Sequence, residues 1–364
     1  MRNRWASALV LIVVLAVACT PAPPPAPTAA PATAAPARAA AAAYTPPAAL
    51  NPPVKVTAVD GGIVANIPLY EGLDKGYFAA EGIDLSLVPL SDASASAQMI
   101  ATNQAQFYIA IPDPVIFNAL VRGVDVKLLL SSTTNAPIDH PAALMVRQDL
   151  IDSGRYKTAA DLKGMTIAAG AISAQFYVAR ALAKGNLTLA DAKVVNVGGL
   201  PDEITALKNK SVDAAWEVEP LITGAERQGI AKAVFGTGEL YPGAVGAALI
   251  MAPSFERDNR EAAVRFVTAY LRGQRDYYHA INKKDTDPGP VIESLTTHTL
   301  VKDPALYQTM GVPSLDPNGT FDPTSWDPFQ DFYVSQSLLE KKLDLTQYLD
   351  TQLVNAAIER LGRE

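Results

Sequence analysis

The sequence predicts an α/β fold made of two lobes. Beyond residue 53, short β-rich runs alternate with segments of helical spacing, which is typical of mostly parallel sheets covered by helices. Residues 54–364 are also long for a single hydrophobic core. Two similar apolar segments, 142–146 (AALMV) and 247–251 (AALIM), bracket a complete set of α/β elements. We interpret them as two crossover strands lying side by side, with the second lobe inserted between them.

The first 18 residues predict a signal peptide. Arg2 and Arg4 precede an apolar run over residues 8–18 that is too short to span a bilayer. Cys19, the only cysteine of the chain, follows this run and would accept a diacylglycerol, as in bacterial lipoproteins. The alternative is ordinary cleavage after residues 16–18 (AVA) and plain secretion. In both cases the mature chain works outside the cytoplasmic membrane. With a lipid on Cys19 we expect it on the cell membrane, at the periplasmic or outer face.

Residues 19–53 are expected to form a tether rather than part of the fold. After Cys19 they are almost entirely Ala, Pro and Thr, a composition that cannot bury a core and favours extended polyproline II structure. At ~3 Å per residue, such a segment could hold a domain up to about 100 Å from the membrane. Because no later stretch is apolar enough to cross a bilayer, we expect the lipid to be the only membrane attachment.

The charge balance argues against a nucleic-acid partner. The net charge of −7 becomes −9 when Arg2 and Arg4 leave with the signal peptide, and no basic cluster occurs in the sequence. Since there is no second cysteine, stability must come from packing and not from disulfides. We expect a monomer that carries no cofactor and no metal.

The first lobe is expected at residues 54–143. Its opening residues, 54–59 (VKVTAV), have the composition of a strand, and the spacing of Leu69, Leu73 and Tyr77 predicts a helix. A Ser-Asp-Ala-Ser segment at 91–94 then caps a helix that runs to about residue 103. In order, the expected strands are 54–59, 83–90, 107–111 and 124–131, and the first expected helix is 68–80.

The second lobe is expected at residues 144–246, and residues 247–364 form the crossover return and complete the first lobe. A segment at 158–164 introduces the first strand inside the second lobe. The expected strands there are 165–169, 193–197 and 212–216, and the expected helices are 173–184 and 202–209. The pattern beyond residue 251 is mainly helical, with expected helices at 259–282, 291–295, 335–342 and 351–361.

Several of these segments carry family motifs. Residues 69–85 (LYEGLDKGYFAAEGIDL) resemble the opening of the nitrate-, sulfonate- and taurine-type solute-binding proteins of ABC transporters. Residues 158–164 (TAADLKG), 206–215 (ALKNKSVDAA) and 219–220 (EP) match further motifs of that group, in the same order. The group also includes proteins similar to the pyrimidine synthase of yeast thiamine biosynthesis, and riboflavin-binding lipoproteins are among its relatives. The resemblance covers nearly all of the chain after the tether.

The resemblance implies a two-lobed type II periplasmic-binding-protein fold with two crossover strands and a ligand in the cleft. It also implies that the closed form delivers its small-molecule ligand to ABC permease and ATPase subunits. Two departures stand out: Val218 replaces the usual Trp, with Trp216 two residues earlier, and residues 209–211 (NKS) replace a Gly-containing turn. The first departure concerns an aromatic ligand contact that the motif would otherwise supply.

Candidate binding residues lie where strands lead into helices, because ligands of open α/β sheets collect beyond the carboxyl ends of strands. The loops concerned are 60–67, 91–94, 112–114, 131–135, 170–175 and 216–219. The candidates within them are Asn66, Asp92, Ser94, Pro112, Asp113, Gly170, Ser173, Gln175, Trp216, Glu217 and Glu219. Loop 170–175 (GAISAQ) is the leading candidate, since its small residues let the backbone approach a ligand at a helix N-terminus.

Each candidate has a structural alternative. Asp92, Asp113 and Ser173 would also serve as ordinary helix N-caps. Trp216 could pack in the core of the lobe instead of stacking on a ring, and Asn66 could hold its own loop. The two glutamates that flank position 218 could be surface carboxylates.

The composition of these loops bears on the ligand. They contain no Arg or Lys, although helix N-termini alone could hold a bare anion, so nitrate and sulfonate stay open. The acidic balance favours a neutral or weakly cationic ligand, such as a heteroaromatic ring. Together with the resemblance this suggests a vitamin-like compound, with riboflavin as the first hypothesis and a thiamine pyrimidine precursor as the second.

The sequence offers little for catalysis. His140, His279 and His298 are not within metal-ligand spacing of one another, and Cys19 lies outside the fold. Residues 316–322 loosely suggest a calcium loop, but the glycine is misplaced and an Asn-Gly turn fits better. We therefore expect a binding protein and not an enzyme. A thiamine-pyrimidine-synthase-like enzyme, or a receptor that works without a transporter, stays as an alternative.

Overall fold

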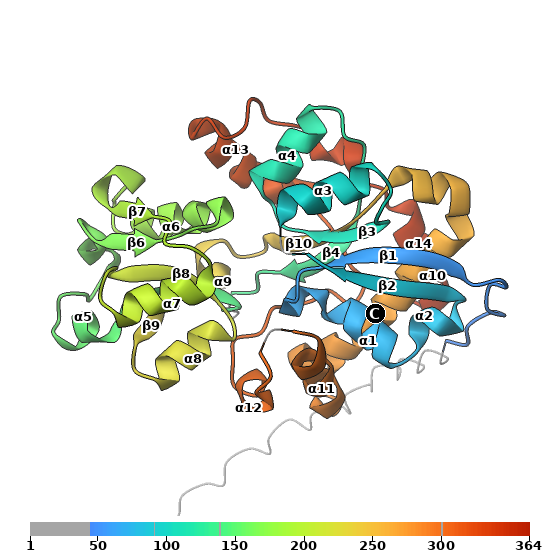
Figure 1. The fold of residues 1–364 in the computed structure, drawn as a ribbon, viewed down its shortest axis with the longest axis horizontal. Coiled ribbons are helices and arrows are strands. Elements are labelled where there is room, and N and C mark those ends of the chain that lie inside the picture. Colours follow the sequence, from blue (N-terminus) through green and yellow to red (C-terminus); the bar gives the residue numbers. More distant parts are fainter. Residues whose placement is uncertain (1–43, 91, 138–139, 300) are drawn as a thin grey trace, which may run out of the picture. The chain divides into compact units, whose positions relative to one another are not determined.

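The computed structural model describes residues 44–364 except 91, 138–139 and 300 (Figure 1). The predicted signal peptide, Cys19 and the first part of the tether lie outside the described residues. The strands form two five-stranded sheets within the described part of the chain. We call the first sheet with its covering helices lobe 1, and the second sheet with its helices lobe 2.

The first sheet has the strand order β2-β1-β3-β10-β4. β1 runs parallel to β2 and β3, whereas β10 runs antiparallel to both β3 and β4. The strands are β1 (Val54–Asp60), β2 (Ile83–Pro89), β3 (Phe107–Ala110), β4 (Lys127–Thr134) and β10 (Val245–Met251). The carboxyl ends of β1, β3 and β4 therefore meet at one edge, and the loops that follow them share that edge.

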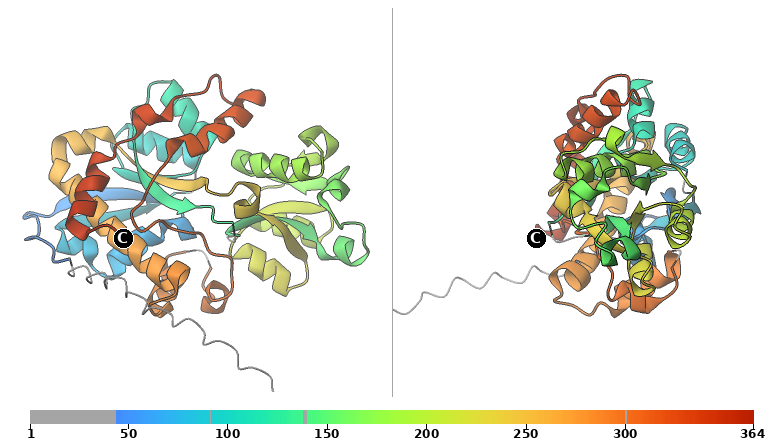
Figure 2. Two further views of the ribbon diagram at one scale, coloured as in Figure 1. Left: turned by 180° about the vertical axis from the view of Figure 1, so that it is seen from behind. Right: turned by 90° about the vertical axis from the view of Figure 1, so that its left-hand side faces the viewer.

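Helices cover both faces of this sheet. The helices are α1 (Ile67–Asp74), α2 (Tyr77–Ala80), α3 (Ala93–Ala101), α4 (Pro114–Val121), α10 (Pro253–Tyr277) and α14 (Gln352–Leu361). α3 and α4 lie on one face, and α1, α2 and α10 lie on the other (Figure 1). A π-helical segment, Tyr278–Lys283, continues α10, and the C-terminal α14 packs beside α10 (Figure 2).

The second sheet has the order β7-β6-β8-β5-β9, with β6 parallel to β7 and β8, and β5 antiparallel to β8 and β9. Its strands are β5 (Ala142–Arg147), β6 (Thr166–Ala168), β7 (Lys193–Val195), β8 (Ala214–Val218) and β9 (Ala231–Gly236). Its helices are α5 (Gln148–Asp152), α6 (Ile172–Lys184), α7 (Leu200–Lys208), α8 (Leu221–Arg227) and α9 (Thr237–Leu240). α6 lies on one face, and α7 and α8 on the other (Figure 1).

Short helices complete the chain beyond α10. They are α11 (Gly289–His298), α12 (Pro304–Tyr307) and α13 (Asp327–Ser335). Single 3₁₀ turns occur at Val64–Asn66, Ala159–Leu162, Leu189–Asp191, Pro323–Trp326 and Leu345–Tyr348. α13 is fastened to lobe 1, since Tyr333 donates a hydrogen bond to the carbonyl of Pro112 (2.8 Å).

The predicted α/β class and the pair of crossover strands are confirmed, but the predicted placement of that pair is wrong. β5 lies between β8 and β9 in lobe 2, whereas β10 lies between β3 and β4 in lobe 1. The two strands are therefore not side by side. Their similar sequences reflect a similar environment, because each is a central strand that is buried on both faces and needs a continuous apolar run.

Some element boundaries also differ from the prediction. The helix predicted over 68–80 is interrupted at Gly76, whose φ of +67° favours glycine and separates α1 from α2. The helix predicted over 335–342 is wrong, since α13 ends at Ser335 and a turn follows. The strand predicted over 212–216 is shifted to β8, and β9, α4 and α8 were not predicted at all.

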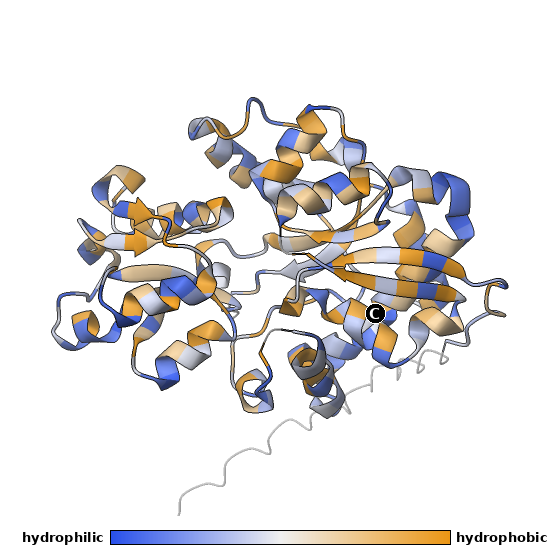
Figure 3. Ribbon diagram, viewed as in Figure 1, coloured by the Kyte–Doolittle hydropathy of each residue, from blue (hydrophilic) through white to orange (hydrophobic). Residues whose placement is uncertain are grey.

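Hydrophobic residues are frequent along the strands of both lobes (Figure 3). One cluster fills the α10 side of the first sheet, where Phe107 and Phe266 stack with ring centroids 3.6 Å apart. A second fills the α7 side of the second sheet around Leu207. A third cluster contains residues of both lobes. In it, Phe176 of α6 contacts Phe329 of α13, with ring centroids 4.0 Å apart. The lobes are therefore bridged by an aromatic contact that lies outside the crossover segments.

Residues 44–53, which the sequence assigned to the tether, contact lobe 1 in the structure. Tyr44 donates a hydrogen bond to the buried Glu81 (2.6 Å), and Arg265 donates to the carbonyl of Ala48 (2.8 Å). Leu50 lies against Gly82, where any side chain would collide with its backbone. This end of the segment is therefore fixed to the fold by specific contacts.

Candidate ligand-binding pocket

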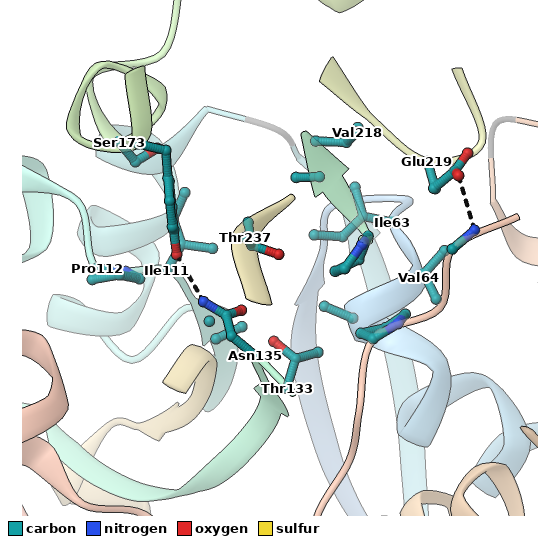
Figure 4. Close-up of a pocket in the computed structure, with 18 of the residues that line it drawn as sticks. Ile63, Val64, Ile111, Pro112, Thr133, Asn135, Ser173, Val218, Glu219 and Thr237 are labelled. Carbon is teal, nitrogen blue, oxygen red and sulfur yellow. Dashed lines mark hydrogen bonds between the residues drawn. The ribbon is translucent and has the colours of Figure 1, made fainter. Parts of the chain in front are cut away.

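A pocket lies where the two lobes and the crossover segments meet (Figure 4). Its volume is about 210 Å³. Lobe 1 and lobe 2 both contribute side chains, as do the segments around Gly311 and α13. The lining residues are Ile63, Val64, Ala65, Ile111, Pro112, Thr133, Asn135, Pro141, Ala142, Ser173, Tyr177, Trp216, Val218, Glu219, Thr237, Gly246, Ala247, Gly311, Pro313 and Phe329. Among these described residues the lining is mostly apolar and contains no Lys, Arg or His.

Asp60, at the end of β1, organises the loop that forms one side of the pocket. Its Oδ1 accepts hydrogen bonds from the backbone of Gly62 (2.9 Å), from Asn66 Nδ2 (3.0 Å) and from the hydroxyl of Tyr70. These hydrogen bonds fix the loop so that Ile63, the residue after Gly62, lines the pocket with 41% of its surface exposed. The candidate Asn66 is thus buried in the loop and does not line the pocket, in agreement with its structural alternative.

An aromatic wall forms the lobe 2 side. The ring of Trp216 stacks on that of Tyr177, with centroids 4.9 Å apart and planes inclined by 8°. Tyr177 comes from α6, which also brings Ser173 to the pocket. Phe329 of α13 contacts Tyr177 edge-on at 5.7 Å and lines the same space. The candidate Trp216 therefore both packs in the lobe and borders the pocket.

Asn135 joins the two crossover segments at the base of the pocket. Its backbone N–H donates to the carbonyl of Ala244 and its carbonyl accepts from Gly243, both at 2.8 Å. Its side-chain Nδ2 donates to the hydroxyl of Tyr177 (3.1 Å) and to the carbonyl of Tyr241 (3.2 Å). One residue thus connects the end of lobe 1, the return crossover and the aromatic wall of lobe 2.

Glu219 lies at another side of the pocket, next to Val218 (Figure 4). Its carboxylate accepts from the backbone and hydroxyl of Thr223 (3.0 and 2.9 Å) and from the backbone of Gly311 (2.9 Å). Burial raises the pKa of Glu219, and these hydrogen bonds oppose the rise. Glu219 therefore links α8 of lobe 2 to the segment that follows α12.

The structure brings four of the predicted candidates to the pocket: Pro112, Ser173, Trp216 and Glu219. Asp92 and Asp113 are N-caps of α3 and α4, where they accept from Ala95 and Val115. These two do not line the pocket. Four further candidates also lie outside the lining: the exposed Ser94, the partly buried Gly170 and Gln175, and the buried Glu217.

Glu217 points away from the pocket because successive residues of β8 face opposite sides of the sheet. Its side chain is fully buried, and neither carboxylate oxygen has a hydrogen-bond partner among the described residues. Burial, together with the negative charge of Glu203, raises the pKa of Glu217 to about 9. Burial also raises the pKa of Glu203 to about 7, although Glu203 accepts a hydrogen bond from the backbone of Gly170 (2.9 Å). Glu217 is thus protonated at neutral pH.

Much of the lining was not predicted from the sequence. Loop 131–135 was among the predicted binding loops, but Thr133 and Asn135 were not singled out within it. Thr237, Gly246 and Phe329 come from segments far along the chain and had no local signal. The only available clue was that polar residues which follow apolar strands tend to lie at the carboxyl edge of a sheet.

No group of three or more His, Cys, Asp or Glu side chains suited to a metal ion occurs among the described residues. Within the same part of the chain, no helix is both long and apolar enough to traverse a bilayer.

Comparison with known proteins agrees with this architecture. The profile of the family described as NMT1/THI5 like matches residues 64–281, which is more than half of the chain. The chain belongs to the NMT1/THI5-like family. The family resemblance inferred from the motifs is therefore confirmed. A search of curated protein sequences gave no significant match.

This chain matches solved structures of similar fold over most of their own length. The sulfonate-binding protein SsuA of Methylobacillus flagellatus KT is 19% identical, with a TM-score of 0.67 over 86% of this chain and 96% of its own. The nitrate-binding protein NrtA of Synechocystis PCC 6803 is 14% identical, with a TM-score of 0.67 over 85% and 89%. The desulfurization enzyme DszB is 16% identical, with a TM-score of 0.63 over 84% and 99%. At these identities the likeness establishes the periplasmic-binding-protein fold.

Proposed function

We propose that this protein is the extracytoplasmic solute-binding component of an ABC importer and that it captures an uncharged small molecule. The observation that carries the proposal is the pocket itself, which has apolar walls, a few neutral polar groups and no cationic side chain in its described lining. Both lobes contribute to these walls, so a ligand there contacts both halves. Such a ligand would stabilise the closed arrangement over an open one, because it binds the closed form more tightly.

The ligand is a heteroaromatic, vitamin-like ring, with riboflavin as the first candidate and a pyrimidine precursor of thiamine as the second. The apolar residues Ile63, Ile111 and Val218, together with the Trp216–Tyr177 wall, suit a flat apolar body. The alternative is a sulfonate, taurine or nitrate ligand, which the SsuA and NrtA neighbours favour. That alternative would require backbone N–H groups and neutral side-chain donors to hold the anion, because the described lining offers no cationic partner.

We further propose that Cys19 carries a lipid and holds the protein at the extracytoplasmic face of the cell membrane. Delivery of the ligand would then involve a permease and an ATPase subunit, with the binding protein acting as a monomer. A receptor that works without a transporter is the alternative, and the neighbouring genes would distinguish the two.

An enzyme is the second class to consider, because DszB shares the fold. The described pocket lining contains neither His nor Cys. Glu219 carries the only carboxyl group of that lining, and both of its oxygens accept hydrogen bonds from the protein. We therefore propose a binding protein in preference to an enzyme.

Calorimetric titration tests the proposal directly. The purified protein is titrated with riboflavin, with an aminopyrimidine and with an alkylsulfonate. Micromolar or tighter binding of an uncharged ring is the expected result. Tight binding of the sulfonate alone would overturn the ligand class, and turnover of any of these compounds would favour the enzyme.

A further inference from the structure

Three neutral polar side chains of the pocket lie together at one end. Thr133, Asn135 and Thr237 gather there, away from Glu219 and Val218 (Figure 4). All three are at least nine-tenths buried, with exposed fractions of 8%, 4% and 5%. All three are also uncharged. A ligand that fills the pocket must place a polar group of its own at this end, because buried polar groups without partners are costly.

The orientation of the Asn135 amide is fixed by its surroundings. Its Nδ2 donates to the carbonyl of Tyr241, which can only accept, so the amide nitrogen must face that way. The second hydrogen on Nδ2 is directed to the hydroxyl of Tyr177. Asn135 therefore presents its oxygen, a pure acceptor, on the opposite side, toward Gly246 of the pocket wall.

Gly246 keeps this oxygen uncovered. A Cβ at that position would lie 2.9 Å from Thr133 Oγ1 and 3.4 Å from Asn135 Oδ1. The lack of a side chain at 246 thus leaves open the space into which both oxygens face.

The hydroxyl of Thr237 supplies an independent observation. Its Oγ1 is buried and has no hydrogen-bond partner among the described residues, yet the residue lines the pocket. Most buried hydroxyls in folded proteins are paired, so an unpaired one that borders a pocket indicates a partner that comes from outside the chain.

We infer that Thr133, Asn135 and Thr237 form a recognition site for an N–H or O–H group of an uncharged ligand. The inference rests on the proposed function and adds the ligand group that the site reads. The Asn135 oxygen accepts from the ligand donor, and the threonine hydroxyls complete the set by accepting or donating. Anions that offer only acceptors, such as nitrate and sulfonates, meet an acceptor at Asn135 and are rejected at this end.

The experiment uses matched pairs of probes in which methyl groups replace the donor hydrogens. Lumiflavin, with one ring N–H, is compared with N3-methyllumiflavin, and 4-amino-2-methylpyrimidine is compared with its 4-dimethylamino counterpart. Ethanesulfonate is the anionic probe. We expect the N–H member of at least one pair to bind about tenfold or more tightly than its methylated partner, which is the value of one hydrogen bond of about 1.4 kcal/mol.

Two variants locate the effect. Thr237→Val should weaken binding of the N–H probe about tenfold without lowering the urea midpoint of the free protein, because no internal hydrogen bond is lost and an unpaired buried hydroxyl is removed. Thr268→Val is the matched control: it removes a buried hydroxyl that donates to Val264 on α10, and it should leave probe affinity unchanged. Gly246→Ala should weaken binding at least tenfold, whereas Gly224→Ala, with open space around its Cβ position, should not.

The outcomes separate the inference from the proposed function. Equal binding within both pairs, or full affinity in the Thr237→Val and Gly246→Ala variants, would overturn the recognition site and leave solute binding intact. Binding of ethanesulfonate alone, or of none of the five probes, would overturn the proposed ligand class and the recognition site together.

Discussion

Replacing Glu217 with glutamine should stabilise the protein, and the gain should grow as the pH rises. The Glu217 side chain is fully buried in lobe 2, and its oxygens have no partner among the described residues. Burial, together with the charge of Glu203, raises the pKa of Glu217 from 4.5 to about 9. The folded chain therefore keeps this proton up to about pH 9, whereas the unfolded chain releases it near pH 4.5.

The pKa difference sets the sign and size of the effect. The stability that the bound proton contributes is complete below pH 4.5 and is lost as the pH rises toward 9, because ionisation favours the unfolded chain over that interval. At about 1.4 kcal/mol per pKa unit, the loss by pH 7 is about 3 kcal/mol. The variant Glu217→Gln does not ionise. Its free energy of unfolding should therefore exceed that of the parent by about 3 kcal/mol at pH 7 and by less than about 1 kcal/mol at pH 5.

Urea denaturation followed by tryptophan fluorescence at pH 5, 6, 7 and 8 measures this difference. The control is Glu293→Gln, which alters an exposed carboxyl on α11 and should change the free energy of unfolding by no more than about 0.5 kcal/mol at any pH. A Glu217→Gln advantage that stays constant across the series, or that shrinks as the pH rises, would contradict this expectation. It would mean that Glu217 is ionised and paired in the folded chain.

Three further predictions address other parts of the molecule. Cys19→Ser should move the protein from the membrane fraction to the soluble fraction and abolish incorporation of labelled palmitate; continued labelling would exclude Cys19 as the acceptor. Asp60→Ala should lower the free energy of unfolding by about 2–3 kcal/mol in urea denaturation, because Asn66 and Tyr70 lose their buried acceptor. An unchanged free energy would mean that the loop does not depend on the Asp60 hydrogen bonds. Phe329→Ala should cost about 3–5 kcal/mol and enlarge the radius of gyration measured by X-ray scattering, since it removes the contact with Phe176 that bridges the lobes. An unchanged radius would show that the Phe329–Phe176 contact is not needed to hold the lobes together.

The predicted and observed positions of the apolar segments show where local sequence stops being informative. Alternation of strands and helices follows from short-range spacing, and most predicted strands lie within a few residues of those observed. The segments 142–146 and 247–251 were recognised as central strands for the same reason, yet they belong to different sheets. Burial on both faces gives both segments the same apolar character, and nothing in that character specifies the neighbouring strand.

The same limit applies to the residues of the pocket. The α/β class, the family motifs and the loops at the carboxyl edges of the strands could be predicted from local sequence, because each depends on neighbouring residues. Tertiary contacts place Trp216 at the pocket and turn Glu217 away from it, and they hold the Asn66 side chain in a hydrogen bond to Asp60. They also place Thr237 and Gly246 beside Asn135, across a hundred residues of chain. Which polar groups stay unpaired depends on packing between distant segments, and local spacing carries no record of that packing.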